Sequence, residues 1–340
     1  MGSQGTSGLA GKRRRVRGRT PAGKGRKVNC LVTGGAGFIG SNLVEALVEA
    51  GHHVRVLDNL SNGDEKNLEP FAGRVEFVRG DVRDRRTVAR AVEGVEVVFH
   101  LAALGSVVRS VEDPAASNDV NVAGTLEVLL AARDAGVRRV VYSSSSSVYG
   151  DNPALPKRED LATSPISPYA VSKLAGEQYA RVFYRVYGLE TVCLRYFNVF
   201  GPRQRPDSPY AAVIPRFMRA ALAGEPLVVF GDGRQSRDFT YVENVVRANL
   251  LAAQAPGVAG EVFNVACGRR ITLLEIIETL ERITGRRLER RHEAPRVGDV
   301  RHSEADVSAA AARLGYRVEV SFEEGLRRTW KAFRARYAAL

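Results

Sequence analysis

The fold is decided by the stretch Thr33-Gly34-Gly35-Ala36-Gly37-Phe38-Ile39-Gly40. Residues 28–33 form a short apolar run that predicts a buried strand, and residues 42–50 predict a helix that ends at Gly51. Between a strand and a helix, three glycines spaced three apart allow a tight turn, close approach of a pyrophosphate and close helix packing. Free N–H groups at the start of the helix favour the same anion. The stretch therefore predicts a dinucleotide-binding turn.

Short apolar runs of the same kind recur through the first part of the chain. They predict strands at residues 54–58, 75–78, 95–101, 137–143 and 190–196, with helix-length segments between them. Strands that are apolar on both faces and alternate with helices indicate a parallel sheet covered on both sides. With right-handed crossovers, the expected fold class is α/β, with a doubly wound parallel-sheet Rossmann domain. Further helices are predicted at residues 168–187, 271–284 and 322–337.

An aspartate, Asp58, ends the second predicted strand, 24 residues after Gly34. A carboxylate there accepts hydrogen bonds from ribose hydroxyls and repels a 2′-phosphate, so NAD is favoured over NADP. Asp81 follows the third predicted strand, and Leu101-Ala102-Ala103 follow the fourth. Both lie at carboxyl ends of strands, where open sheets of this kind bind ligands.

The positive charge of the chain is concentrated at its amino terminus. The 340 residues carry a formal charge of +12, and residues 1–27 hold nine Lys or Arg and no acid, which leaves +3 for the remainder. Because this segment is rich in Gly, Ser and Thr, we expect a disordered basic tail and no specific nucleic-acid partner.

The remaining composition is ordinary for a globular protein, with 44% hydrophobic and 26% charged residues. The three cysteines, Cys30, Cys193 and Cys267, show no paired spacing, so neither a disulfide nor a metal site is expected. No apolar run approaches the roughly 18 residues that cross a bilayer, and the amino terminus lacks the apolar segment of a secretory signal. We therefore expect a cytoplasmic protein without membrane association.

Tyr169 and Lys173 are four residues apart in the helix predicted at 168–187, so they share one face of it. A nearby ammonium favours the phenolate and lowers the pKa of a tyrosine toward neutral pH. Such a tyrosine acts as a general acid or base on a hydroxyl group. The serine run Ser143–Ser147 ends the fifth predicted strand, where a serine hydroxyl would orient the same substrate hydroxyl.

Together these motifs resemble an extended short-chain dehydrogenase/reductase of the NAD-dependent nucleotide-sugar epimerase/dehydratase family. The resemblance runs from residue 28 to the carboxyl terminus. It rests on the glycine stretch, His100-Leu-Ala-Ala103, the serine run to Gly150, Tyr169-x-x-x-Lys173 and Leu194-Arg-Tyr-Phe-Asn198. It implies Tyr169 as the base, Lys173 as its partner and ligand of the nicotinamide ribose, and Ser145 as the orienting hydroxyl, with Ser146 as the other choice.

The resemblance also implies which residues bind NAD and the sugar nucleotide. The expected NAD residues are Gly34, Gly37, Phe38, Ile39, Asp58, Asn59, Asp81, Val82, Leu101, Ala102, Ala103, Ser143, Tyr169, Lys173 and Tyr196. The expected substrate residues are Ser106, Ser145, Ser147, Asn198, Val213, Arg237, Arg296, Asp299 and Ser303. Of these, Asn198, Arg237 and Arg296 would meet the diphosphate. Asp299 would bind the uridine ribose, and Ser303 would lie beside the 2-substituent of the sugar.

The residues after Ser145 separate the reactions of this family. Related 4,6-dehydratases carry Asp-Glu in the next two positions and related decarboxylases carry a Glu in the second, whereas this chain has Ser146 and Ser147. Because a hydroxyl cannot readily replace a carboxylate in acid–base work, reversible oxidation at C4 is the expected chemistry. Tyr169 would remove the C4 proton while hydride passes to NAD, the 4-keto sugar would turn, and hydride would return to its opposite face. The cofactor would stay bound throughout.

A serine at 303 leaves room for an N-acetyl group, and with Tyr210-Ala-Ala-Val-Ile-Pro215 the chain is most similar to bacterial UDP-N-acetylglucosamine and UDP-glucose 4-epimerases. The expected substrates are UDP-GlcNAc and UDP-GalNAc, with UDP-Glc and UDP-Gal open. The alternative is a UDP-glucuronate 4-epimerase, with Arg203 or Arg205 facing the carboxylate, followed by another nucleotide-sugar dehydratase or reductase. An idle NAD-sensing scaffold and a polyanion-binding tail are weaker alternatives.

The expected domain organisation has three parts. Residues 1–27 form the tail, and residues 28–197 form the NAD-binding Rossmann domain, to which part of 236–265 returns. Residues 198–340 form a smaller α/β substrate-binding lobe. The resemblance further implies a homodimer formed through the helices near 118–135 and 168–187.

Overall fold

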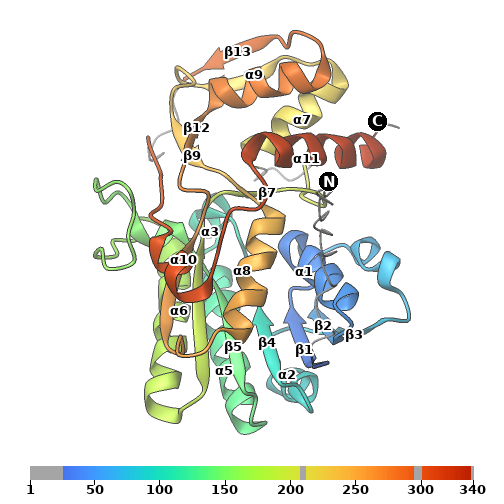
Figure 1. Cartoon of the computed structure of the whole chain (residues 1–340), viewed down its shortest axis with the longest axis vertical. Coiled ribbons are helices and arrows are strands. Elements are labelled where there is room, and N and C mark those ends of the chain that lie inside the picture. Colours follow the sequence, from blue (N-terminus) through green and yellow to red (C-terminus); the bar gives the residue numbers. More distant parts are fainter. Residues whose placement is uncertain (1–25, 207–211, 295–300, 338–340) are drawn as a thin grey trace, which may run out of the picture.

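Seven parallel strands form the central sheet of the computed structural model, which describes residues 26–206, 212–294 and 301–337 (Figure 1). Their order is β11-β6-β5-β4-β1-β2-β3. The strands are β1 Asn29–Thr33, β2 His53–Asp58, β3 Val75–Arg79, β4 Val97–His100, β5 Arg139–Ser145, β6 Glu190–Tyr196 and β11 Glu261–Val265. The predicted doubly wound α/β sheet is confirmed.

Strand β1 is the point where the winding of the sheet reverses. Its last residue, Thr33, pairs with Leu57 of β2 on one side and with His100 of β4 on the other. The chain leaves β1 toward β2 and β3, then returns to β4 on the opposite side. A crevice opens at the carboxyl ends of strands at such a reversal, and this is where such folds bind ligands.

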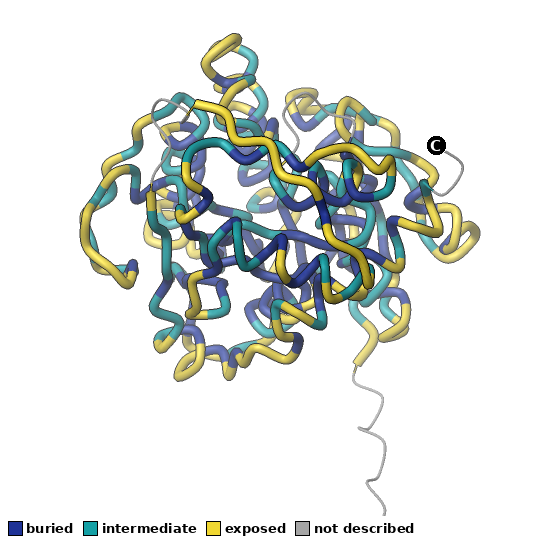
Figure 2. Tube along the Cα trace, turned by 90° about the horizontal axis from the view of Figure 1, so that it is seen from above, coloured by how far each residue is buried: buried dark blue, intermediate teal, exposed yellow. Residues whose placement is uncertain are grey.

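Helices cover both faces of the sheet. One face packs against α1 (Phe38–Glu49) and α8 (Val242–Gln254). The other packs against α2 (Arg85–Val92), α5 (Gly124–Asp134) and α6 (Pro168–Tyr187). Seen from above, the buried parts of the chain lie at the centre, between layers that carry the exposed residues (Figure 2). This two-sided cover is why the strands read as continuous apolar runs.

Several element boundaries differ from the predicted ones. Helix α1 begins at Phe38, directly after the extended Gly37, so the glycine stretch itself forms the start of the helix. Strand β5 continues to Ser145, which pairs with Tyr196 of β6, so two more serines lie in the strand than the apolar run indicates. Strand β4 ends at His100, which leaves residues 101–103 in the loop after it.

The chain after β6 builds a second lobe above the carboxyl edge of the sheet (Figure 1). Its helices are α7 Val213–Ala223, α9 Leu273–Thr284 and α11 Phe322–Tyr337, whereas α10 Ser308–Leu314 packs beside β11 and α8 at the edge of the sheet (Figure 1). Its short strands are β7 Val199–Phe200, β8 Leu227–Phe230, β9 Ser236–Asp238, β10 Thr240–Tyr241, β12 Arg270–Thr272 and β13 Arg290–Glu293. Strand β13 runs parallel to β8, and β12 runs antiparallel to β9.

One hydrophobic core connects the two lobes. It joins Leu43 and Val44 of α1 to Phe217 of α7, Ile276 of α9 and Trp330 of α11. Burial of side chains of this size stabilises each by about 1.5–3 kcal/mol. The second lobe is therefore fixed over the sheet rather than tethered beside it. None of the helices in the described ranges is long and apolar enough to span a membrane.

The short helical elements of the Rossmann part include α3 Val107–Glu112, α4 Pro114–Asn118 and a π-helical turn at Asp119–Ala123 that leads into α5. The sequence analysis did not predict this wide turn. Its wider spacing turns Asn121 inward, where it bonds the loop after β4.

Candidate active site

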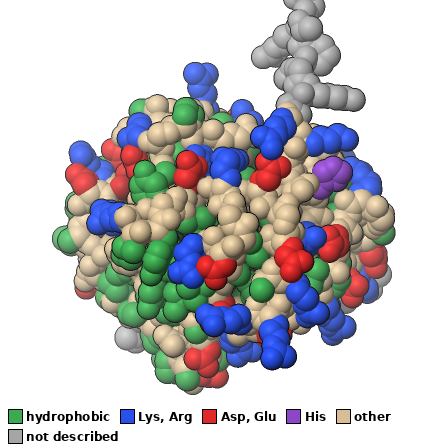
Figure 3. All heavy atoms as spheres, turned by 90° about the horizontal axis from the view of Figure 1, so that it is seen from below, with side chains coloured by type: hydrophobic (Ala, Val, Ile, Leu, Met, Phe, Trp, Pro, Cys, Tyr) green, Lys and Arg blue, Asp and Glu red, His purple; other side chains and the backbone are tan. Residues whose placement is uncertain are grey.

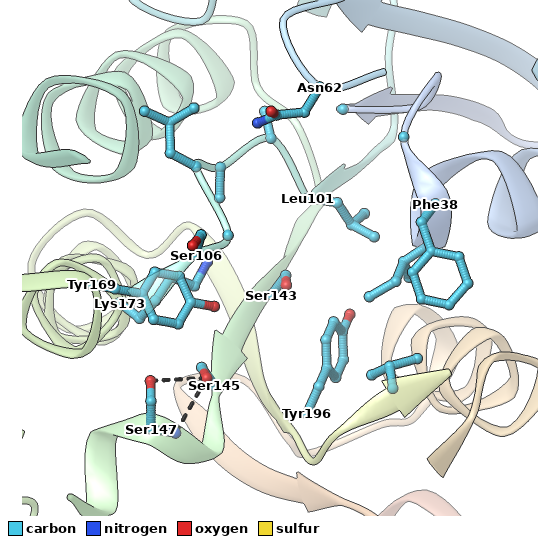
Figure 4. A pocket seen from close by; sticks show the side chains of 18 of the residues that line it. Phe38, Asn62, Leu101, Ser106, Ser143, Ser145, Ser147, Tyr169, Lys173 and Tyr196 are labelled. Atoms are coloured by element: carbon cyan, nitrogen blue, oxygen red, sulfur yellow. Dashed lines mark hydrogen bonds between the residues drawn. The ribbon is translucent and has the colours of Figure 1, made fainter. Parts of the chain in front are cut away.

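A cavity of about 1050 Å³ lies at the carboxyl ends of β1, β4, β5 and β6, beneath the second lobe. The glycine loop forms one end, and Ser303 with Arg237 of the second lobe forms the other. The helix α6 and the serines of β5 border its middle (Figure 4). With this volume, and with a lining that runs from the glycine loop to the second lobe, the cavity has room for a dinucleotide and a second ligand.

The glycine loop packs so closely on itself and on the loop after β4 that side chains at its glycines would clash with backbone. A Cβ on Gly34 would lie 2.8 Å from the backbone nitrogen of Ala102, and Gly34 has the positive φ of 71° that glycine accepts readily. A Cβ on Gly40 would lie 2.1 Å from the carbonyl oxygen of Gly34. No side chain caps the start of α1 at Gly37, so its first N–H groups face the cavity without a competing acceptor.

The carboxylate of Asp58 is held in a fixed orientation at the end of β2. It accepts hydrogen bonds from the N–H groups of Ala36 (2.9 Å) and Leu60 (2.8 Å). Burial raises the pKa of Asp58, and these two hydrogen bonds oppose that rise. The group lines the cavity next to the glycine loop, as the ribose-binding prediction requires.

Most of the residues predicted to bind NAD line this one cavity. Those that do are Gly34, Gly37, Phe38, Ile39, Asp58, Asn59, Val82, Leu101, Ala102, Ala103, Ser143, Tyr169, Lys173 and Tyr196. Asp81 does not. Its carboxylate pairs with Arg83 at 2.8 Å and accepts a hydrogen bond from Asn59, and these contacts hold its pKa below the usual range. Asp81 follows β3, as predicted, but its ion pair with Arg83 was not predicted.

Tyr169 and Lys173 project from α6 toward the end of β5 (Figure 4). The helix begins here because Ser167 caps it, accepting a hydrogen bond from the N–H of Ala170, and Pro168 suits its first position. The N–H of Tyr169 donates to Ser110 at 3.0 Å. Lys173 is 3% exposed, and its ammonium lies 4.6 Å from the centre of the Tyr142 ring.

The pKa values of Tyr169 and Lys173 are shifted differently from the expectation. Burial raises the pKa of Tyr169, and a hydrogen bond with Ser145 opposes the rise. Burial lowers the pKa of Lys173 to about 7. The expected fall in the pKa of the tyrosine is therefore wrong for the protein alone, because loss of water raises this pKa more than Ser145 lowers it.

The serines after Tyr142 alternate in direction, as side chains of a strand do. Ser143 and Ser145 point to the cavity, whereas the hydroxyl of Ser144 donates to Glu177 at 2.7 Å. Ser147 donates to the hydroxyl of Ser145, oxygen to oxygen 2.9 Å (Figure 4). Ser145 and Tyr169 both face the cavity, and Ser145 opposes the rise in the pKa of Tyr169, which favours Ser145 over Ser146 as the orienting hydroxyl (Figure 4).

Six of the predicted substrate residues also line the cavity: Ser106, Ser145, Ser147, Asn198, Arg237 and Ser303. Asn198 adopts a positive φ of 34° after β6, and its amide donates to the carbonyl of Asp238. Val213 is not among the lining residues, since it packs on the core at the start of α7. Arg296 and Asp299 lie outside the described residues.

Of the two arginines proposed to face a uronate carboxylate, Arg203 is already paired. Its guanidinium forms an ion pair with Glu45 of α1 at 2.7 Å and lies over the ring of Phe71. The ion pair fixes this end of Arg203 to α1, although Arg203 also lines the cavity. Arg205 lines the cavity.

The cavity residues that were not singled out from the sequence include three polar ones, Asn62, Arg109 and Lys157. Lys157 is 3% exposed, and its ammonium donates to the carbonyl of Asn152. Its backbone pairs with residues 304–306, which brings a proline-rich segment beside the substrate end of the cavity. No periodic pattern marks this segment, so the sequence offered no signal for it.

Comparison with known proteins identifies the class of protein that this fold and cavity define. The model of the NAD dependent epimerase/dehydratase family matches residues 30–266. A UDP-glucose 4-epimerase from Mycolicibacterium smegmatis is 42% identical over 308 residues, which cover 89% of this chain and 98% of that protein.

Two solved structures superpose over nearly the whole chain. A UDP-N-acetylglucosamine 4-epimerase from Methanobrevibacter ruminantium, in complex with UDP-N-acetylmuramic acid, has 41% identity and a TM-score of 0.88, and the match covers 92% of this chain and 99% of that one. A UDP-glucuronic acid 4-epimerase from Bacillus cereus, in complex with UDP-glucuronic acid and NAD, has 33% identity and a TM-score of 0.85, with coverage of 91% and 100%.

The chain belongs to the NAD-dependent epimerase/dehydratase family. The predicted family and the predicted cofactor, NAD, are confirmed, and the protein is an NAD-dependent enzyme of this family.

Proposed function

We propose that this enzyme interconverts UDP-GlcNAc and UDP-GalNAc by epimerisation at C4, with UDP-Glc and UDP-Gal as further substrates. The activity of a UDP-sugar 4-epimerase is supported by the relatives that carry this activity in their names. The preference for N-acetylated sugars is supported by Ser303, a small residue that lines the substrate end of the cavity.

The observation that carries this proposal is the scarcity of carboxylates in the cavity. Among the described lining residues Asp58 is the one acid, and its two oxygens already accept hydrogen bonds at the glycine loop. Elimination of water requires a further acid and base next to the sugar. Ser146 and Ser147 occupy that place, which supports an epimerase over a dehydratase or a decarboxylase.

In the proposed mechanism Tyr169 takes the proton from the C4 hydroxyl, which Ser145 orients. Lys173 stabilises the phenolate that accepts this proton. The NAD bound along the glycine loop would accept hydride from C4 and supply it again to the opposite face. Tyr169 then returns its proton to the C4 oxygen of the inverted sugar, so atoms and charge balance over the cycle. Asn198 and Arg237 would hold the diphosphate while the 4-keto sugar turns.

A UDP-glucuronate 4-epimerase stays the alternative. Such an enzyme needs a cation for the C6 carboxylate, and the ion pair of Arg203 with Glu45 makes that arginine unsuitable. Lys157 and Arg205 line the cavity and are the cations that favour this alternative.

One experiment decides between these substrates. Purified enzyme is incubated with UDP-GlcNAc, UDP-Glc or UDP-GlcA without added NAD, and each mixture is analysed by NMR. We expect UDP-GalNAc from the first at the highest rate. Formation of UDP-galacturonate alone would establish the alternative. A 4-keto-6-deoxy sugar or a pentose would overturn the epimerase proposal.

We also propose that the enzyme is a homodimer formed through α6, as the resemblance implies, and through α3 rather than the other expected segment, 118–135, in which no large hydrophobic side chain is exposed. Exposed apolar side chains concentrate there: Val107, Val108 and Val111 on α3, and Val171, Tyr179, Val182 and Val186 on α6. Hydrophobic side chains gather on one side of the face shown in Figure 3. Monomeric proteins seldom expose such a continuous patch to water. A second copy of the chain would cover it.

A further inference from the structure

Glu177 is a fully buried acid on the active-site helix. It is 0% exposed and follows Lys173 by four residues and Tyr169 by eight, so all three lie on one face of α6. Removing a carboxylate from water costs several kcal/mol unless charged partners compensate it. The contacts of Glu177 show which groups do so.

Both oxygens of Glu177 are occupied. One accepts hydrogen bonds from the hydroxyl of Ser144 (2.7 Å) and from Nε of Arg195 (3.0 Å), and the other accepts from Nη2 of Arg195 (2.7 Å). The guanidinium of Arg195 also lies 4.7 Å from the centre of the Tyr149 ring. The carboxylate thus joins α6 to β5, one residue before Ser145, and to β6.

A buried ion pair of this kind is weak evidence for stability, because apolar residues of similar volume often stabilise a protein equally well. Its position suggests an electrostatic role instead. Burial lowers the pKa of Lys173 to about 7, and Cys193 and then Glu177 oppose this fall. Near neutral pH, the state of Lys173 is therefore sensitive to a single neighbouring charge.

Lys173 is surrounded by ionisable groups from one helix and three strands. The ionisable groups that face it are Tyr169 and Glu177 on α6, His100 on β4, Tyr142 on β5, and Cys193 and Arg195 on β6.

Most of these groups carry no charge near neutral pH. Burial raises the pKa values of Tyr142 and Cys193 well above their usual values, so both keep their protons. Burial lowers the pKa of His100 to about 3, so its ring is neutral. Within the described residues, Glu177 is then the negative charge of this group, and Arg195 is the positive charge that partly offsets it.

We propose that Glu177 is a positioning residue for the catalytic pair: its carboxylate keeps Lys173 in the ammonium form and, through Ser144, holds the strand end that carries Ser145. The inference rests on the roles proposed for Tyr169 and Lys173. It adds a residue that acts through them and touches no substrate.

The test is a direct titration of Lys173 in the NAD-bound enzyme. The chain has seven lysines, so labelling lysine with ¹³C at Cε gives few NMR signals, and Lys173→Arg assigns the relevant one. We expect Glu177→Gln to move the titration of Lys173 to lower pH by roughly 0.5–1 unit. The matched control Ser144→Ala removes the hydrogen bond but no charge and leaves the titration in place. An unchanged titration in folded Glu177→Gln would overturn the proposal.

Glu177→Gln leaves Arg195 buried without its counter-charge, so the variant could fail to fold. The double variant Glu177→Gln, Arg195→Gln removes both charges and keeps polar partners. Because Glu177 acts on Lys173 more strongly than Arg195 does, we still expect a shift to lower pH. A purely structural role would lower the melting temperature of the double variant without moving the titration, and that result would contradict the proposal.

Turnover gives a second, separable measurement. Since Lys173 has to be protonated, kcat/KM should fall on the alkaline side at a lower pH in Glu177→Gln, whereas Ser144→Ala should lower kcat at unchanged pH dependence. If the wild-type enzyme epimerises none of the sugars, the proposed function fails. The NMR titration still decides whether Glu177 holds the charge of Lys173.

Discussion

The hydroxyl of Ser147 donates a hydrogen bond to the hydroxyl of Ser145 over 2.9 Å. Ser145 in turn opposes the rise in the pKa of Tyr169. The two serines therefore form a short chain of hydroxyl groups beside the phenol. Donors in such a chain strengthen one another, so a residue without substrate contact can still affect the base.

The first prediction concerns this chain of serines. Ser145→Ala should lower kcat by roughly a hundredfold, and Ser147→Ala by about tenfold or less, because loss of one acid–base partner costs in this range. Ser145→Ala should also move the acid side of the pH profile to higher pH, since the hydrogen bond that lowers the pKa of Tyr169 is lost. Steady-state kinetics between pH 6 and 10 (roughly the span in which a tyrosine base titrates) measure both effects.

Ser146→Ala is the matched control, because Ser146 lines the same cavity without this contact. It should retain at least about half of the activity, as a residue outside the acid–base chain would. If Ser146→Ala loses as much as Ser145→Ala, then Ser146 is the orienting hydroxyl.

The second prediction concerns the base itself. Tyr169→Phe should reduce turnover by roughly a thousandfold while the ring still fills its place in the cavity. In the wild-type enzyme turnover should rise with pH on the acid side, because burial favours the protonated phenol and a higher pH restores the phenolate. Bound NAD, measured after denaturation, should be unchanged in the variant. Retained activity would exclude Tyr169 as the base.

The sequence predicted those parts of the site that depend on local spacing. Tyr169 and Lys173 share a face because a helix fixes the direction of residues four apart. The glycine loop and Asp58 were found for the same reason, since a strand, a tight turn and a helix follow one another without interruption. The parallel sheet covered on both faces followed from the apolar runs, because both faces of the central strands are buried under helices.

Other features depended on contacts between distant segments. Strand β5 reaches Ser145 because β6 pairs with it there, although serine itself does not favour strands. The long side chain of Arg203 finds Glu45 on α1, 158 residues away in the chain. Glu177 illustrates the same limit, because its spacing to Lys173 was visible but its partner Arg195 was not.

The third prediction tests the close packing of the glycine loop. In Gly40→Ala the new Cβ would lie 2.1 Å from the carbonyl oxygen of Gly34, a contact that only movement of the loop can relieve. Overpacking of this kind costs roughly 1–3 kcal/mol, and more where backbone is the obstacle. We therefore expect a lower melting temperature and loss of bound NAD, measured by scanning calorimetry and by absorbance of the released cofactor.

Gly51→Ala is the control for that change. Gly51 also has a positive φ, of 83°, but no atom lies within 4 Å of a Cβ placed there. It should cost roughly 1 kcal/mol from backbone strain and keep its NAD. Equal losses of NAD in both variants would show that the close approach of Gly40 to Gly34 does not matter for the cofactor.

The fourth prediction concerns the apolar face of α6. Val182 and Val186 are four residues apart, 45% and 63% exposed, and lie on one side of the helix. Two charged side chains in the middle of a hydrophobic interface would remain without partners, which costs several kcal/mol on association. The double variant Val182→Glu, Val186→Glu should therefore be monomeric by light scattering, whereas the wild type should be dimeric. Val318→Glu, at an exposed valine outside the patch, should stay dimeric.

Because α6 also carries Tyr169 and Lys173, the monomer should lose part of its turnover even at saturating substrate. A wild-type monomer, or a double variant that still dimerises, would show that another surface or none joins the subunits.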